Sequence, residues 1–134
     1  MNDSFPQNPA LPSKISVHES KYESDEFFTE LILSFRQALP EFANQLQACH
    51  DLQDFEELKR HAHRLRGTAL VLGFDGLAEH FYALERLCTF VPDPETFDAE
   101  VATIRKVQGE STVATIVQLM REIAGHTGDK KDAP

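Results

Sequence analysis

Residues 54–73 read DFEELKRHAHRLRGTALVLG, and their apolar side chains follow a helical period. At about 100° per residue, these side chains fall in one stripe along a helix: Leu58, Ala62, Leu65, Ala69 and Leu72. Such a stripe is the buried face of an amphipathic helix. His63 lies roughly 140° from the centre of the stripe, so we expect its imidazole to face solvent.

The residues around this histidine on the same helix surface are two cations, a glycine and an apolar residue. Lys59 and Arg66 place positive charge where an anion such as a phosphoryl group could bind. Gly67 costs a helix interior about 1 kcal/mol relative to alanine, and it leaves space because residues four apart are neighbours. Leu70 is apolar on an otherwise polar surface. This combination predicts an exposed nucleophile that reacts when a partner protein docks beside it.

A family resemblance rests on the same residues. Residues 63–69, HRLRGTA, followed by Leu-Gly at 72–73, resemble the signature of histidine-containing phosphotransfer (HPt) domains, A-H-x-L-K-G-[ST]-A followed by L-G. The resemblance implies that His63 accepts a phosphoryl group at Nε2 and that Gly67 gives a partner access. Arg66 stands where the family usually has lysine, which keeps the charge and the reach. We therefore assign phosphate stabilisation to Arg66 and Lys59.

The resemblance also implies a function in two-component signalling. The chain would accept a phosphoryl group on His63 from a receiver-domain phospho-aspartate and pass it to another receiver aspartate. The expected partners are response-regulator receiver domains and a hybrid sensor histidine kinase, and the receiver would supply Mg²⁺. Gly67, Leu70 and Arg64 would provide partner access and docking. We expect no cofactor and no enzyme activity, because no Walker-type or glycine-rich kinase loop is present.

Three other interpretations compete with this one. The chain could be a helical binding module that sequesters a receiver domain without carrying phosphate. A dimeric histidine-kinase bundle is disfavoured because the single chain has enough apolar residues for its own core. A metal site on His61 and His63 is also disfavoured, because residues two apart on a helix point in different directions.

Four amphipathic segments predict four helices. Ser24 is expected to cap the first helix and Pro40 to kink it, and its apolar stripe reads Phe28, Leu31, Phe35, Leu39, Phe42, Leu46 and Cys49. Asp54 is expected to cap the second helix through a capping-box pattern, and Gly73 to end it. The fold class is therefore all-α, an antiparallel up-down four-helix bundle with a short N-terminal helix or arm.

The third and fourth helices follow the same logic. Asp75 is expected to cap a helix whose apolar residues are Leu77, Phe81, Leu84 and Cys88, and residues 91–94 to stop it. Asp93 and Pro94 are expected to begin the last helix. Its apolar positions are Phe97, Val101, Ile104, Thr112, Ile116, Leu119 and Ile123, and residues 108–110 could bend or split it.

At 134 residues we expect a single domain. We assign residues 1–20 to a flexible N-terminal arm, 21–125 to the bundle, and 126–134 to a flexible tail. Within the arm, residues 14–21 could form a short helix that packs Ile15 and Val17 on the bundle.

The composition narrows the possible partners. A net charge of −9 disfavours nucleic acid as a partner, and the cations gather around His63.

Cys49 and Cys88 show no metal-like spacing, so we expect free, partly buried thiols in a reducing compartment. No apolar run is long enough to cross a membrane and no signal peptide is evident. We therefore expect a cytoplasmic monomer with no membrane contact.

Overall fold

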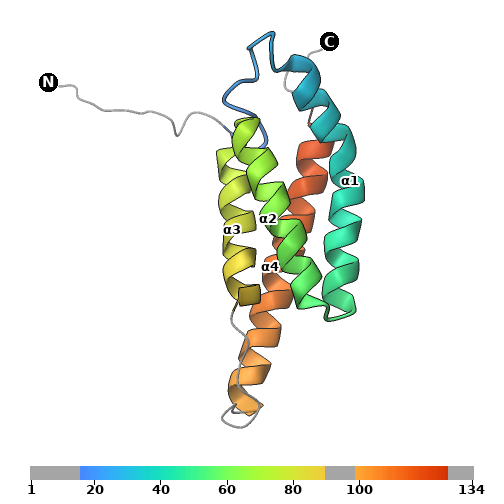
Figure 1. Ribbon diagram of the computed structural model, residues 1–134, viewed down its shortest axis with the longest axis vertical. Helices are drawn as coiled ribbons and strands as arrows, with labels where there is room; N and C mark the ends of the chain where they lie inside the picture. Colours follow the sequence, from blue (N-terminus) through green and yellow to red (C-terminus); the bar gives the residue numbers. More distant parts are fainter. Residues whose placement is uncertain (1–15, 90–98, 127–134) are drawn as a thin grey trace, which may run out of the picture.

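The part of the chain that the structure describes folds into four helices. The computed structural model describes residues 16–89 and 99–126, and the side chains of 16–89 and 106–126. The helices are α1 (Thr29–Asp51), α2 (Phe55–Val71), α3 (Asp75–Thr89) and α4 (Ala99–Gly125). Successive helices run in opposite directions, and the first turns of α4 extend beyond the other three (Figure 1). This arrangement confirms the predicted all-α, antiparallel up-down bundle.

Helix α2 forms as its sequence predicts. The Asp54 side chain accepts a hydrogen bond from the backbone N–H of Glu57, which caps the first turn. Every residue of the predicted stripe is buried: Leu58, Ala62, Leu65, Ala69 and Leu72. Gly73 follows with φ of +84°, a left-handed conformation that favours glycine. The tight turn to α3 then buries Phe74 completely.

Helix α1 begins later than predicted and buries a different stripe. Ser24 does not cap it, because residues 21–28 form turns and the helix starts at Thr29. The Asp25 carboxylate accepts a hydrogen bond from the N–H of Phe27, a local turn that competes with helix formation. The buried residues are Ile32, Phe35, Arg36, Leu39, Ala43 and Leu46.

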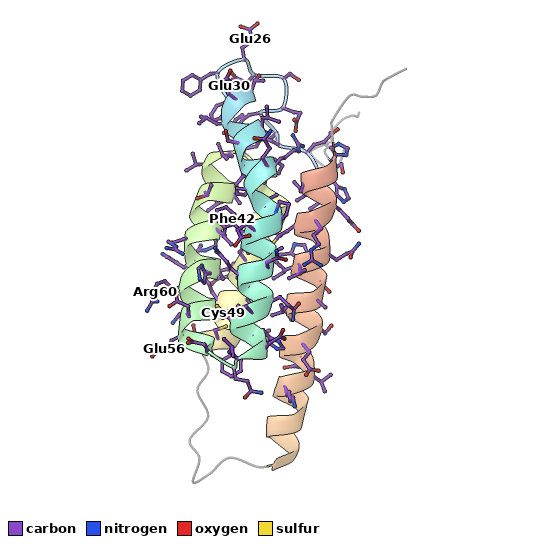
Figure 2. All side chains as sticks on the ribbon, turned by 90° about the vertical axis from the view of Figure 1, so that its right-hand side faces the viewer. Glu26, Glu30, Phe42, Cys49, Glu56 and Arg60 are labelled. Carbon is purple, nitrogen blue, oxygen red and sulfur yellow. The ribbon has the colours of Figure 1, made fainter. Side chains whose placement is uncertain are left out.

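The predicted stripe of α1 was therefore wrong at its edges. Leu31 is 48% exposed, and Phe42 is only partly buried at the α1 surface (Figure 2). Apolar residues flank the buried stripe of α1 on both sides, so the spacing of apolar residues could not determine which face of the helix is buried. The helix continues through Pro40.

The segment before α1 packs on the bundle rather than forming a free arm up to residue 20. The Ser20 hydroxyl, which is buried, donates to the carbonyl of Leu72. The backbone N–H of Lys21 donates to the carbonyl of Gly73, with the two atoms 3.0 Å apart. Residues 16–21 form turns instead of the short helix considered above, and Val17 packs against the core. The packed unit thus includes residues 16–20.

The buried guanidinium of Arg36 ties this segment to α1 and α4. It donates to both carboxylate oxygens of Glu23, to the carbonyl of His18 and to the carbonyl of Ile123. A buried charge is tolerated when it is paired and hydrogen-bonded in this way. The burial of Arg36 was not predicted from the sequence, because this residue lies within an otherwise apolar stripe.

Helix α4 is continuous from Ala99 to Gly125, so residues 108–110 do not split it. His126 lies against the bundle, with its Nε2 3.2 Å from a carboxylate oxygen of Glu19, whereas the sequence predicts that it belongs to the flexible tail. The expected stop at 91–94, the caps Asp93 and Pro94, and the side chains of Phe97, Val101 and Ile104 lie outside the described residues.

Both cysteines are free and partly buried. Burial raises the pKa of the Cys88 thiol to about 11, so this thiol stays protonated near neutral pH. Among the helices described, none combines the length and the apolar character that a membrane crossing requires.

Candidate functional site

His63 lies on the solvent side of α2, as the helical period predicts. Its side chain is 66% exposed. The buried stripe of α2 packs on α3 and the rest of the core, which turns the imidazole outward. The ring is therefore open to a second macromolecule.

A buried carboxylate from α3 holds the inner edge of this imidazole. Oε1 of Glu85 lies 2.9 Å from Nδ1 of His63, and the Glu85 side chain is only 10% exposed. An ionised carboxylate can only accept hydrogen bonds, so Nδ1 carries the hydrogen. In a neutral imidazole the lone pair is then on Nε2, which is the free nitrogen.

The second oxygen of the same carboxylate binds Arg66. Nε of Arg66 donates to Oε2 of Glu85 across 2.6 Å. Within the described residues, the two terminal nitrogens of this guanidinium make no hydrogen bond, so four N–H groups remain for an anion. Glu85 thus places an imidazole and a guanidinium side by side.

The aromatic ring of Tyr82 on α3 lies close to the guanidinium of Arg66. The guanidinium carbon of Arg66 lies 5.1 Å from the centroid of the Tyr82 ring, within the range of a cation–π contact. The guanidinium of Arg86, one turn further along α3, lies 5.9 Å from the same ring.

The surface beside the histidine is open. A Cβ atom built on Gly67 would meet nothing within 4 Å. Leu70 is 48% exposed one turn further along α2. Gly67 therefore leaves open space and Leu70 is exposed on the same helix, as the periodicity predicts.

The other cations of α2 differ in their surroundings. Lys59 is exposed and lies near Cys88. Its charge lowers the pKa of the Cys88 thiol, but burial raises that pKa more strongly. Arg64 instead contacts His61, with its Nη2 2.9 Å from Nδ1 of the His61 ring. Arg60 pairs with Glu57 and points away from the bundle (Figure 2). Arg66 is thus the only one of the four that shares a partner with His63.

Sequence reasoning missed Glu85 and Tyr82. A signal was available for Glu85, because it lies four residues after Phe81 and next to Leu84, on the buried side of α3. A charged residue at a core position needs a partner. Its position did not indicate which residue of another helix that partner would be.

No metal site accompanies these residues. In the described part of the chain, no three His, Cys, Asp or Glu side chains come close enough together to hold a metal ion.

A known protein family covers most of this chain. The Hpt domain family matches residues 30–124, which span most of the chain and all of the described helices except the ends of α1 and α4. No curated protein and no solved structure matches the chain. Hpt domains are helical phosphocarrier modules that interact with receiver domains and histidine kinases. The chain belongs to the Hpt domain family and has a phosphotransfer relay role in two-component signalling.

Proposed function

We propose that His63 is the phosphoacceptor of this chain, taking a phosphoryl group from a receiver-domain phospho-aspartate and passing it to another receiver aspartate. One observation carries the proposal. An exposed imidazole has its Nδ1 held by the buried carboxylate of Glu85, so that Nε2 is left free. A histidine that was merely solvated would have no need of an oriented ring.

The transfer needs no proton to enter or leave. The lone pair of Nε2 attacks phosphorus, and the N–P bond forms as the P–O bond to the receiver aspartate breaks. The electron pair of the broken bond stays on the aspartate carboxylate. The ring keeps its hydrogen on Nδ1 and becomes positively charged beside the Glu85 carboxylate, which favours that charge. Onward transfer reverses these events with a second receiver.

Arg66 and Lys59 would stabilise the phosphoryl oxygens. The free N–H groups of Arg66 suit the planar geometry of phosphate recognition. Phosphoryl transfer proceeds through a loose transition state, so positioning and charge stabilisation contribute most of the catalysis. An open helix face is therefore sufficient if the receiver supplies the rest of the site.

Gly67, Leu70 and Arg64 would form the access and docking surface. The open space over Gly67 lets the receiver approach the imidazole, and Leu70 offers an apolar contact. The receiver would bring Mg²⁺, and the chain would need no cofactor of its own. A hybrid sensor histidine kinase, acting through its receiver domain, is the donor class that fits, and the chain would act as a cytoplasmic monomer.

The test is transfer of labelled phosphate from phosphorylated receiver domains to the wild type and to His63→Gln. His80→Gln on α3 is the matched control, because His80 bonds to the carbonyl of Gly76 and takes no part in the site. We expect acid-labile label on the wild type and on the control only. Equal labelling of His63→Gln would refute the proposal. Receiver binding that survives His63→Ala, without any phosphohistidine, would instead support a binding module.

A further inference from the structure

The surface of α3 beside the site carries an exposed aromatic residue with two guanidinium groups near its ring. Tyr82 is 48% exposed, and the guanidinium carbons of Arg66 and Arg86 lie 5.1 Å and 5.9 Å from its ring centroid. Exposed aromatic and arginine side chains are enriched at protein interfaces and supply many of their strongest contacts. We call Tyr82 and Arg86 the α3 strip.

The strip is continuous with the histidine. Glu85 lies between Tyr82 and Arg86 in the sequence, but its carboxylate is turned inward to His63 and Arg66. Among the described residues, Arg86 forms no ion pair. The strip therefore extends the cationic surface of α2 onto α3.

The opposite side of α2 is less suited to an acidic partner. Arg60 pairs with Glu57, and Arg64 bonds to His61. Helix α1 carries the exposed carboxylates Glu30 and Glu41, and Figure 2 shows Glu30 projecting near the start of α1. Helix α3 also has an exposed carboxylate, that of Glu79, which precedes Tyr82 and lies about two turns from Arg86.

We propose that the α3 strip is a second contact surface for the receiver domain, so that the docked receiver lies across α2 and α3. This inference rests on the proposed function of His63. The partner surface is the rim of a phospho-aspartate pocket, which carries the charge of the phosphoryl group and of the pocket carboxylates. Arg86 attracts this rim, and Tyr82 offers it an exposed aromatic ring.

Complementary charge mainly accelerates association and depends on salt. Arg86→Glu should lower the second-order rate constant of transfer from the fastest receiver of the source organism about tenfold at ~50 mM salt. The difference should shrink to about twofold at ~0.5 M salt, because the Debye length falls to a few ångströms. Tyr82→Ala should cost about three- to tenfold, and Tyr82→Phe, which keeps the ring, less than about twofold.

Two controls separate docking from chemistry. Arg121→Glu makes the same change of charge on α4, where Arg121 bonds to Asn44, and it should transfer at the wild-type rate. Phosphoramidate, a small phosphodonor that needs no docking surface, should label His63 equally in the wild type and in Arg86→Glu.

The outcomes distinguish the two proposals. Normal transfer to Arg86→Glu and Tyr82→Ala would overturn the α3 strip and leave the role of His63 intact. A loss that is as large with phosphoramidate as with the receiver would also overturn it, because the strip would then act on the chemistry. Failure of wild-type His63 to accept phosphate from any receiver would refute the proposed function itself.

Discussion

His63 on α2 and Glu85 on α3 are joined through Nδ1 and Oε1, which lie 2.9 Å apart. The two residues are 22 positions apart in the sequence, and the contact exists only because α2 and α3 pack against each other. The same carboxylate binds Arg66 through its second oxygen. One buried group therefore orients both the proposed nucleophile and its neighbouring cation.

Glu85→Gln should slow phosphorylation of His63 by about tenfold, or about 1.4 kcal/mol in the barrier. In the amide an NH2 group replaces one of the two carboxylate oxygens, so one of the two donors, Nδ1 of His63 or Nε of Arg66, would face another donor instead of an acceptor. It also lacks the charge that stabilises the phosphorylated ring. Labelling with phosphoramidate and with a receiver measures the rate, and ¹⁵N NMR of the imidazole measures the tautomer. Glu110→Gln on α4 is the control for charge, and unchanged rate and tautomer in Glu85→Gln would contradict the orienting role.

Arg66→Ala should reduce transfer from a receiver by about ten- to a hundredfold, because a charge-assisted contact to phosphate is lost. Arg66→Lys should retain most of the rate, since the charge and the reach remain, although the contacts with Glu85 and Tyr82 change. Rates for both variants, compared with Arg121→Ala, provide the measurement. A wild-type rate in Arg66→Ala would remove this residue from the site.

Gly67→Ala should stabilise the fold by about 0.5–1 kcal/mol, because glycine in an exposed helix interior is unfavourable and the new Cβ meets nothing. Gly67→Gln should also fold normally, yet it should block transfer from a receiver by filling the approach to His63. Thermal unfolding measures the first effect and receiver transfer the second. If Gly67→Gln accepted phosphate at the normal rate, the access role of the glycine would be wrong.

Acid should weaken the anchoring of the segment before α1. Burial alone would raise the pKa of the Glu23 carboxyl. The hydrogen bonds that Glu23 accepts from Arg36 and from the backbone N–H of Ser20, together with the charge of Arg36, lower this pKa more strongly. The pKa of Glu23 therefore lies below its ordinary value. Because this pKa is lower in the folded than in the unfolded chain, the ionised Glu23 carboxylate stabilises the fold at pH values above its unfolded pKa of about 4.3. That stabilisation is lost as the pH falls through the pKa of Glu23 in the folded chain.

This sign can be checked with Glu23→Gln. The variant should have a lower Tm than the wild type at pH 7, and the difference should narrow as the pH falls below about 4. Glu26→Gln, at an exposed position, is the control. A Tm difference that stays constant between pH 7 and pH 3 would show that the ionised carboxylate contributes no stability.

The sequence alone determined the local features of this protein. Periodicity predicted the buried stripe of α2, the exposure of His63 and the open position of Gly67, because these depend only on the geometry of one helix. Capping chemistry correctly placed Asp54 before α2. Where apolar residues lay on both edges of a stripe, as at Leu31 and Ile32, the same reasoning chose the wrong edge.

Only the tertiary structure decided which residues meet. The contact of Glu85 with His63 depends on the register between two packed helices, which no single helix encodes. The packing of residues 16–23 likewise depends on Arg36 and Glu23 and on the carbonyls of Leu72 and Gly73, which the fold brings together from distant parts of the chain. Such contacts are made between elements, so the pattern within each element could not predict them.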